Sequence, residues 1–384
     1  MQLVAYGAQD IYLTGNPQIT FFKVVYRRHT NFAMEAIEQT MNGTAGYGNR
    51  VTTTVSRNGD LVGPVYLEYV QSGNDATACA NPGTALIDNV ELEIGGQRID
   101  KQHGHFMEVW FQLNQSNPTG SNPTSADVAI QSNEATSWTT FQKMSGSGGV
   151  KGATDTMERI FVPFQFFFCR NPGLALPLIA LQYHEVKMNI TFNTAAACGG
   201  NSTFGTASVW ADYFYLDTDE RRRFAQVSHE YLIEQVQYQA GGAAATSHDL
   251  NFNHPVKELI WTGGVTTDGP SATTGPSTPL GLATGNYRLV LNGHDRMAQR
   301  DLKYFTRAQV WQHHSGHGSI NVIDSIAVYS FALKPEEHQP SGTCNFSRID
   351  NAQLKSPSDV IDVYAVNYNV LRIMSGMGGL AYSN

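Results

Sequence analysis

The sequence predicts an all-β fold of the sandwich or jelly-roll type in which one β unit occurs twice. Short apolar runs with alternating polar residues recur along most of the 384 residues, and loops rich in Gly, Asn, Pro and Ser separate them. Apolar residues at helical spacing are scarce, and 36 glycines together with 19 Phe and 17 Tyr favour strands and turns. Short motifs also reappear at nearly constant offsets, which predicts a duplication.

The segment VELEIGGQRI shows the strand pattern most clearly. Val90, Leu92 and Ile94 alternate with Glu91 and Glu93, so one face of this strand is apolar and the other acidic. The pattern returns in YRLVLNGHDR, whose Asn-Gly pair predicts a hairpin turn. The other predicted strands are 33–40, 51–57, 65–70, 160–168, 184–192, 208–216, 231–238, 257–261, 326–333 and 361–373.

Two sequence echoes support the duplication. Ile-Glu-Gln at 37–39 returns at 233–235, an offset of 196 residues (233 minus 37). The Leu-x-Ile-Gly-Gly motif at 92–96 returns as Leu-x-Leu-Asn-Gly at 289–293, an offset of 197 residues (289 minus 92). Because the two offsets nearly agree, we predict that two related units follow each other along the chain.

A third echo indicates that the second unit is shorter. Val-Trp-Ala at 209–211 returns as Val-Tyr-Ala at 363–365, an offset of only 154 residues (363 minus 209). The fall in offset predicts that the second unit has lost loops after its midpoint. Their counterpart in the first unit is the polar segment 115–138, which we expect to be a long surface loop.

A short helix is predicted between the two units, in LDTDERRRFAQ. Thr218 can cap this helix. Asp219 and Glu220 suit its positive N-terminus, and the three arginines at 221–223 suit its C-terminal end. Since no long flexible linker is present, the two units should pack firmly side by side. The predicted organisation is an N-terminal anchoring segment at 1–30, a first unit at 31–216, a connector at 217–226 and a second unit at 227–384.

The stretch NPQITFFKVVYRRHTNF predicts a short amphipathic helix in the N-terminal segment. Asn16 is a favoured N-cap, and Pro17 suits the first helical position. Ile19, Phe22 and Tyr26 would then share one face beside a basic stripe, and the aromatic rings would anchor the helix beneath the first unit. The residues to which we assign an assembly role are Phe22, Lys23, Tyr26, Arg27 and Arg28.

Composition limits the classes of partner and compartment. A formal net charge of −8 argues against direct binding of nucleic acid. No apolar run approaches the ~18 residues of a membrane-spanning helix, and the first residues carry no secretory signal pattern. The cysteines are widely scattered without CxxC spacing, so we expect reduced thiols rather than a disulfide framework or a structural metal site. They are Cys79, Cys169, Cys198 and Cys344.

Candidate catalytic residues are few. Glu91 and Glu93 resemble the paired carboxylates of a glycosidase, but no third acidic residue continues the pattern and a solvent-facing strand face explains both. The alternative function is a carbohydrate-binding or glycoside-hydrolysing β-sandwich that uses this pair or a loop aromatic residue such as Trp138. We predict that the chain is not an enzyme and has no catalytic residue and no cofactor.

Two histidine clusters are the candidate metal ligands. They lie in HHSGH and HGH, and zinc or copper could use such side chains. Both clusters occupy Gly-bearing, turn-like segments without a nearby acidic or Cys ligand, so we interpret them as surface-loop histidines and predict no metal site. Their members are His313, His314, His317, His103 and His105.

Several long, ordered blocks of the chain carry a family resemblance. They are LVAYGAQDIYLTGNPQITFFKVVYRRHTNF, VSRNGDL, VELEIGGQRIDK, PGLALPLIALQYHEVK, RFAQVSHEYLIEQVQ, SGTCNFSRIDNA and NYNVLRIMSGMGGLAYSN. Together they resemble the major capsid protein of the nucleocytoplasmic large DNA viruses, most closely that of the chlorella-virus (phycodnavirus) type. The resemblance runs from residue 3 to residue 384 and fails mainly in the loops 114–155, 240–250 and 262–286.

The resemblance implies a fold and a function. Members of this family have two consecutive eight-stranded jelly rolls, which would be the two units predicted above. Three chains form a capsomer with a pseudo-hexagonal outline, and capsomers tile an icosahedral shell. The implied partners are a second and third copy of the chain, neighbouring capsomers, minor capsid proteins and the internal viral membrane. The basic residues of the N-terminal segment would face one of these partners.

The resemblance also implies a location and a modification. The chain would be a late structural protein of the virion, located in the outer capsid shell and in the host cytoplasm during assembly. Glycans would be attached covalently to outer loops, at positions that the sequence does not identify. Because the second unit is short in its outer loops, we expect its surface tower to be low.

Overall fold

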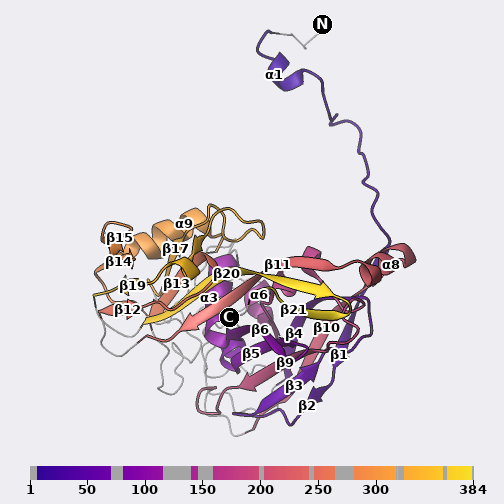
Figure 1. Cartoon of the computed structure of the whole chain (residues 1–384), viewed down its shortest axis with the longest axis horizontal. Helices are drawn as coiled ribbons and strands as arrows, with labels where there is room; N and C mark the ends of the chain where they lie inside the picture. Colours follow the sequence, from indigo (N-terminus) through magenta and orange to yellow (C-terminus); the bar gives the residue numbers. More distant parts are fainter. Residues whose placement is uncertain are drawn as a thin grey trace.

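The computed structural model describes residues 7–70, 81–115, 140–145, 159–198, 203–241, 246–263, 281–316, 318, 324–357 and 361–382. Within these ranges the chain forms two β-sandwiches that lie side by side (Figure 1). The N-terminal segment extends away from both sandwiches, and the C-terminal strands return to the region between them (Figure 1).

The first sandwich has jelly-roll topology. Its strands are β1 (Phe32–Gln39), β2 (Met41–Asn42), β3 (Arg50–Thr54), β4 (Leu61–Val70), β5 (Ile87–Ile94), β6 (Gln97–His103), β7 (Arg159–Pro163), β8 (Leu176–Pro177), β9 (Val186–Phe192) and β10 (Thr206–Leu216). One sheet has the order β1-β10-β4-β7, with β8 also paired to β4, and the other has the order β2-β3-β9-β5-β6. When β2 and β3 count as one interrupted second strand, the two sheets follow the jelly-roll orders 1-8-3-6 and 2-7-4-5.

The second sandwich repeats this topology. Its strands are β11 (His229–Gln239), β12 (Ser247–Asp249), β13 (Pro255–Gly263), β14 (Asn286–Leu291), β15 (His294–Asp295), β16 (Arg300–Asp301), β17 (Ile326–Ser330), β18 (Cys344–Asn345), β19 (Ala352–Lys355), β20 (Ile361–Met374) and β21 (Met377–Leu380). The sheets β11-β20-β13-β17 and β12-β19-β14-β15 again have the orders 1-8-3-6 and 2-7-4-5, with β15 and β16 as the fifth strand. Strands β18 and β21 extend the first of these sheets. The predicted all-β, double jelly-roll fold is confirmed.

The sequence echoes fall on equivalent strands of the two sandwiches. The first echo lies in β1 and β11, the second in β5 and β14, and the third in β10 and β20. The second echo ends in the same kind of turn in both sandwiches. Gly95 and Gly96 have positive φ angles of 59° and 84°, and Asn292 and Gly293 have 52° and 76°. Two consecutive positive φ angles characterise the type I′ hairpin turn, which explains why Gly and Asn occupy these positions.

Most of the length difference between the sandwiches lies between their fifth and sixth strands. From β6 to β7 there are 55 intervening residues, 104–158, whereas from β16 to β17 there are 24, 302–325. The third echo predicts that the second sandwich has shorter loops after its midpoint, and this shorter connection agrees with the prediction. The predicted surface loop 115–138 itself lies outside the described residues, apart from its first residue.

Each sandwich has its own apolar core. The first core gathers side chains from both sheets, including Val90, Leu92 and Ile94, as the alternation in β5 predicts. The second core forms around Trp261, Tyr287 and other inward-facing residues. Several predicted strand limits are too long because the chain turns helical or irregular earlier: β7 ends at Pro163 and β17 at Ser330.

Helices occupy the connections and one end of the fold. They are α1 (Ile11–Thr14), α2 (Pro82–Ala85), α3 (Gly104–Asn114), α6 (Thr140–Ser145), α7 (Phe167–Arg170), η2 (Pro172–Leu174), α8 (Thr218–Gln226), η3 (Tyr304–Ala308), α9 (Gln309–His313) and η4 (Phe346–Arg348). The predicted connector helix is α8, but Asp217 and not Thr218 is its cap, since the Asp217 carboxylate accepts from the Thr218 N–H at 2.7 Å. Within the described ranges, no helix is long and apolar enough to span a bilayer.

The predicted amphipathic helix from Asn16 onward is wrong in position. The N-terminal segment contains one short helix, α1, and residues 15–31 have no regular secondary structure. Asn16 has a φ of 50° and lies in the left-handed region, not in the extended conformation of an N-cap. A short helix is only marginally stable unless its apolar face packs on another surface, and this segment extends away from both sandwiches (Figure 1).

Candidate functional site

A helix of the first sandwich packs on the second sandwich. Met107 and Phe111 on one side of α3 belong to the core of the first sandwich. The opposite side of α3 packs on the outer face of sheet β11-β20-β13-β17, so that this sheet is covered on both faces. The side chains of this contact are Phe106, Val109, Trp110 and Leu113 of α3 and Val236, Ile260, Val310, Ile326, Val328, Tyr364 and Val366 of the second sandwich. We call the contact between α3, β6 and this sheet the seam.

Polar groups close the edge of the second sandwich at the seam. The Gln235 side-chain amide in β11 donates to the Ile99 carbonyl in β6, and the Val236 N–H donates to the Asp100 carboxylate at 3.1 Å. Gln102 donates to the same carboxylate at 2.9 Å. Burial raises the pKa of Asp100 to about 6, against the opposing effect of these hydrogen bonds. The fifth strand of the first sandwich therefore covers the open edge of the first strand of the second.

A buried group of charges lies in the seam. The Lys257 ammonium is 2.8 Å from Glu234 and donates to the Pro335 carbonyl at 2.5 Å. Glu234 also pairs with Arg170 of the first sandwich at 3.0 Å. The Arg170 guanidinium lies over the ring of Trp110, 4.1 Å from its centre. Because these charges come from both sandwiches and compensate one another, they fix how the sandwiches face each other.

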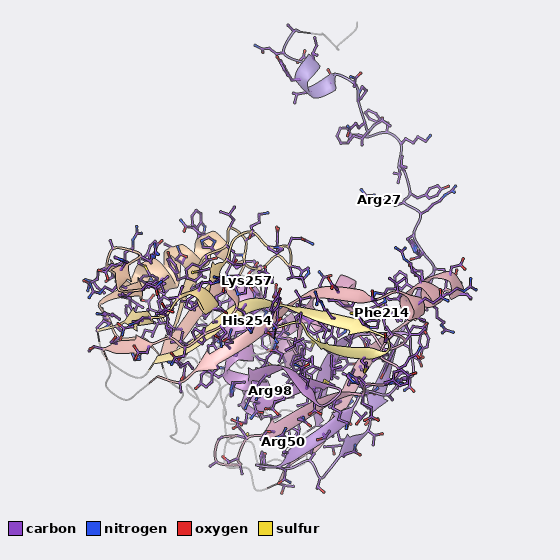
Figure 2. The ribbon with its side chains drawn as sticks, in the orientation of Figure 1. Arg27, Arg50, Arg98, Phe214, His254 and Lys257 are labelled. Atoms are coloured by element: carbon purple, nitrogen blue, oxygen red, sulfur yellow. The ribbon has the colours of Figure 1, made fainter. Side chains whose placement is uncertain are left out.

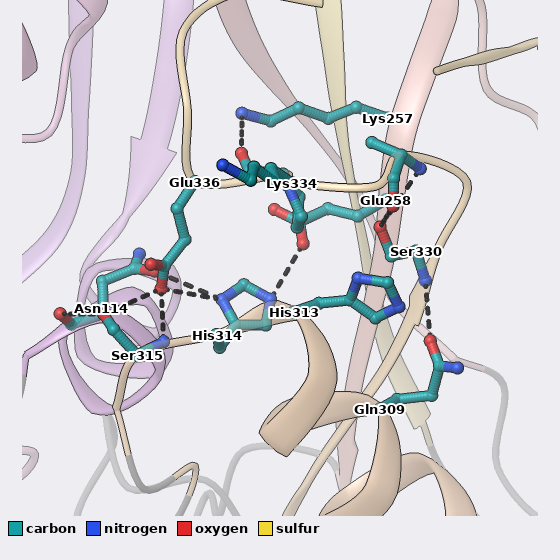
Figure 3. Close-up of polar contacts among 12 residues, drawn as sticks. Asn114, Lys257, Glu258, Gln309, His313, His314, Ser315, Ser330, Lys334 and Glu336 are labelled. Carbon is teal, nitrogen blue, oxygen red and sulfur yellow. Dashed lines mark hydrogen bonds and ion pairs between the residues drawn. The ribbon is translucent and has the colours of Figure 1, made fainter. Parts of the chain in front are cut away.

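His314 is a second charged centre of the seam (Figure 3). Its Nε2 atom is 3.0 Å from Glu258, and its Nδ1 atom is 3.3 Å from Glu336 and 3.2 Å from the Asn114 side-chain oxygen at the end of α3. Burial by itself lowers the pKa of His314, but the two carboxylates outweigh it and raise the pKa to about 9. Ser315 joins the network by donating to the Asn114 carbonyl at 3.0 Å. A protonated imidazole thus links the two sandwiches at neutral pH.

The interpretation of the histidines as surface-loop residues is wrong for His105 and His314, which are both buried in the seam. The Nδ1 atom of His105 lies 2.8 Å from the Tyr364 hydroxyl, and burial lowers the pKa of His105 to about 3. His103 is half-buried, with its ring centre 4.7 Å from that of Tyr238, and burial also lowers its pKa. Both imidazoles are therefore neutral packing elements at physiological pH.

The remaining candidate ligands do not form a metal centre. His313 is partly exposed, with its Nδ1 atom 3.2 Å from the Leu333 carbonyl, and His317 lies outside the described residues. Among the residues that the structure describes, no three His, Cys, Asp or Glu side chains are grouped closely enough to hold a metal ion. The described cysteines, all of them free thiols, are Cys169, Cys198 and Cys344.

The candidate carboxylate pair has no arrangement that suits glycoside hydrolysis. Glu91 forms ion pairs with Arg50 at 2.6 Å and with Arg98 and Lys101 at 3.7 Å. Glu93 accepts a hydrogen bond from Asn189 at 3.3 Å. These contacts fit the predicted polar face of a strand, where opposite charges on neighbouring strands pair. The loop aromatic residue of the alternative function, Trp138, lies outside the described residues.

The residues with a predicted assembly role lie together on the exposed N-terminal arm, residues 7–31. Phe22 is 98% and Tyr26 76% exposed, and Lys23, Arg27 and Arg28 are exposed beside them. Figure 2 shows Arg27 far from both sandwiches. The arm carries further exposed apolar residues: Ile11, Tyr12, Leu13, Ile19, Phe21, Val24 and Val25. So many apolar side chains in contact with water indicate a surface that another molecule covers.

Apart from His105 and His314, which were assigned to surface loops, the buried polar residues of the seam escaped the sequence-based prediction, although one signal was present. Lys257 and Glu258 are consecutive in β13 at a register shift against β20, and both are fully buried with their charged groups in the seam. A Lys-Glu pair directly before the apolar run Leu-Ile-Trp is consistent with a strand that is covered on both faces. The partners Arg170, His314 and Glu336 lie far away in the sequence and give no such signal.

Two family models match the chain almost end to end. The model described as the N-terminus of the major capsid protein matches residues 20–217, and the model described as the large eukaryotic DNA virus major capsid protein matches residues 220–379. The boundary between the matches coincides with the connector helix α8.

Individual proteins give the same result. The chain is 50% identical to the major capsid protein of Pyramimonas orientalis virus, with 100% of this chain and 99% of the relative covered. It is 43% identical to the major capsid protein of Paramecium bursaria Chlorella virus 1, with the same coverage. Among solved structures, a chain of the PBCV-1 virus capsid superimposes with a TM-score of 0.74 at 38% identity, covering 95% of this chain and 100% of that one.

Proposed function

This chain belongs to the family of major capsid proteins of large eukaryotic DNA viruses, and we propose that three copies of it form a capsomer that tiles an icosahedral shell. The family consists of structural proteins of the virion capsid and not of enzymes, so the function is assembly. Two jelly rolls in each of three chains give six similar units, which suit a pseudo-hexagonal outline.

One observation carries the proposal of a ring. The first strand of the second sandwich, β11, has its edge closed by β6, and the central residues Ile233, Glu234 and Gln235 are buried. The equivalent strand of the first sandwich, β1, is an edge strand of its sheet, and most of its residues are exposed. The equivalent of β6 in the second sandwich, β15 and β16, is exposed throughout.

The seam joins a fifth strand to a first strand. Within the described chain β6 and β11 form this contact, whereas the equivalent strands, β15 with β16 and β1, do not. Joining the unused fifth strand of one chain to the unused first strand of the next repeats the internal contact between chains. Such a head-to-tail contact forms a closed ring when the rotation between subunits closes. Three chains would supply six seams, three within chains and three between them.

Light scattering of the purified protein tests the trimer. We expect a mass near three times 42.1 kDa, and a strictly monomeric protein would contradict the proposal. Electron microscopy of assemblies tests the tiling, because trimers with a pseudo-hexagonal outline should pack into flat facets. Discrete trimers that never form facets under assembly conditions would limit the function to the capsomer.

We further infer that the N-terminal arm contributes to assembly through Phe22, Lys23, Tyr26, Arg27 and Arg28. A neighbouring subunit, a minor capsid protein and the internal viral membrane are the candidate partners, since each could cover apolar side chains and accept basic ones. Deleting residues 1–27 should impair shell formation while both sandwiches stay folded, because the arm contributes nothing to either core. Unchanged trimer and shell formation after the deletion would rule the arm out.

The proposed setting of this function is the virion shell, with assembly in the host cytoplasm late in infection. Covalent glycans on outer loops are part of the proposal. Asn189 and Asn42 each begin an Asn-x-Thr sequence, the pattern of N-glycosylation. Asn189 is a poor acceptor because it is buried in β9, whereas Asn42 is exposed. Mass spectrometry of intact and deglycosylated virion protein tests for the modification.

A further inference from the structure

The helix that follows the fifth strand has a different environment in the two sandwiches. In the first sandwich this helix is α3, and its outward side is buried in the seam, where Trp110 is 6% exposed. In the second sandwich the same place in the chain is taken by η3 and α9. Phe305 anchors them in the core of the second sandwich, as Met107 anchors α3 in the first. Their outward side carries Trp311, which is 82% exposed.

The sheets on which such a helix can pack also differ. Sheet β11-β20-β13-β17 of the second sandwich is covered by α3, whereas the outward face of sheet β1-β10-β4-β7 of the first sandwich is open. In the second sandwich Ile260 of β13 pairs with Tyr364 of β20, and α3 leaves them 0% and 1% exposed. The equivalent pair in the first sandwich is Tyr66 of β4 with Trp210 of β10. These two side chains are only half-buried, together with Phe161 of β7, whose ring centre lies 6.0 Å from that of Tyr66.

The open helix and the open sheet face carry opposite charges. In the segment from residue 296 through α9, Arg296, Arg300 and Lys303 accompany the single acid Asp301. A fourth cation, Arg307, is paired with Asp324 at 2.8 Å. The outward side of sheet β1-β10-β4-β7 carries Glu38, Glu68 and Asp212, and its cation Arg159 is paired with Glu68 at 2.6 Å. Opposite charges on the two surfaces favour their association and fix its orientation.

We propose that Trp311 is the anchor of the contact between chains, and that it packs on the Tyr66–Phe161–Trp210 face of a second copy of this chain. The proposal rests on the trimer proposed above and assigns its surface. In Figure 1, α9 lies on the second sandwich at the upper left and β1 on the first sandwich at the lower right, so the two elements are at opposite ends of the molecule, as a head-to-tail contact requires. A large aromatic side chain seated in an aromatic surface with a charged rim is typical of interface hot spots.

The test uses the full chain in two variants and one control. Trp311→Glu places an acid against the acidic face and should convert the trimer to a monomer, which should keep the circular dichroism spectrum of the folded chain because this side chain is exposed within one chain. Tyr183→Glu is the matched control, since Tyr183 is 75% exposed but lies on neither face, and it should remain trimeric. The double variant Glu38→Lys/Asp212→Lys changes the receiving face and should also weaken the trimer.

A photo-crosslink locates the partner surface. With p-benzoylphenylalanine in place of Trp311, irradiation should produce a species of twice the chain mass whose linked peptides contain Tyr66, Phe161 or Trp210. If Trp311→Glu stays trimeric and the crosslinks lie elsewhere, this contact is wrong while the trimer stands. If the wild-type chain is itself a monomer, the proposed function fails as well, so the two failures are distinguishable.

Discussion

The buried contact between His314, Glu258 and Glu336 predicts that the stability of the chain falls in mildly alkaline solution. The pKa of His314 is raised from an ordinary 6.5 to about 9 in the folded chain. A group with a raised folded pKa contributes its full stabilisation below its unfolded pKa and loses it as the pH rises through the folded pKa. The contribution of His314 should therefore be complete below about pH 6.5 and disappear above about pH 9.

The size of the effect follows from the shift. One pKa unit corresponds to about 1.4 kcal/mol, so a shift from 6.5 to about 9 corresponds to ~3 kcal/mol of unfolding free energy. The loss should be steepest between these two pH values, with a slope of about −1.4 kcal/mol per pH unit from this one group. Since Asn114 and Glu336 lie on opposite sides of the seam, the loss acts on the contact between the sandwiches.

Urea unfolding at half-unit steps from pH 6 to pH 10 measures this slope. Other groups titrate in the same pH range, so the informative quantity is the difference in the slope of unfolding free energy against pH between the wild type and His314→Gln. The neighbouring His313→Gln is the matched control, because His313 contacts only the Leu333 carbonyl among the contacts in the described part of the chain. The wild type and His313→Gln should share the slope, and His314→Gln should lack it. Equal slopes in all three proteins would refute the reasoning.

Three further outcomes follow from the seam and the turns. Trp110→Ala should lower the unfolding free energy by about 3–5 kcal/mol, whereas Trp311→Ala should change the unfolding free energy of the isolated chain by less than about 0.5 kcal/mol. Denaturant titration compares the two variants, and equal losses of unfolding free energy would contradict the difference in burial. Lys257→Met should lower the unfolding free energy by about 2–3 kcal/mol, because the buried Glu234 then keeps only one of its two cations, Arg170. Lys334→Met removes an exposed ion pair and should lower the unfolding free energy far less, and equal losses in the two variants would count against the reasoning. Gly95→Ala should lower the melting temperature more than Gly293→Ala, although both positions have positive φ. The added Cβ would lie 2.2 Å from the His184 ring at position 95 and would meet no atom within 4 Å at position 293. Similar decreases in melting temperature would argue against a clash.

Local patterns were sufficient to predict the fold and its duplication. Alternation in β5 defined its buried face, the Gly-Gly and Asn-Gly pairs marked equivalent hairpins, and three echoes fell on equivalent strands. These features depend on residues close in sequence, where strand periodicity and turn geometry act. The connector helix was also predictable, because its charges suit the ends of a helix in its own sequence.

The same local reasoning failed where a distant surface decides the outcome. The helix expected from Asn16 onward does not form, since its apolar face has nothing in the chain to pack on. His105 and His314 looked like loop residues, yet the packing of α3 on the second sandwich buries both. In each case the local sequence does not show which distant surface, if any, packs against the segment.

The sequence by itself therefore determined the strands, their turns and the repetition of one jelly roll. Only the tertiary structure decided which repeated surfaces are used within the chain and which remain open. Ile-Glu-Gln occurs in both first strands, but Glu234 is buried beside Lys257 and Arg170, whereas Glu38 faces solvent. Identical local sequences meet different neighbours because one chain of two sandwiches can form the seam only once, so the other first strand and the other fifth strand stay open in the single chain.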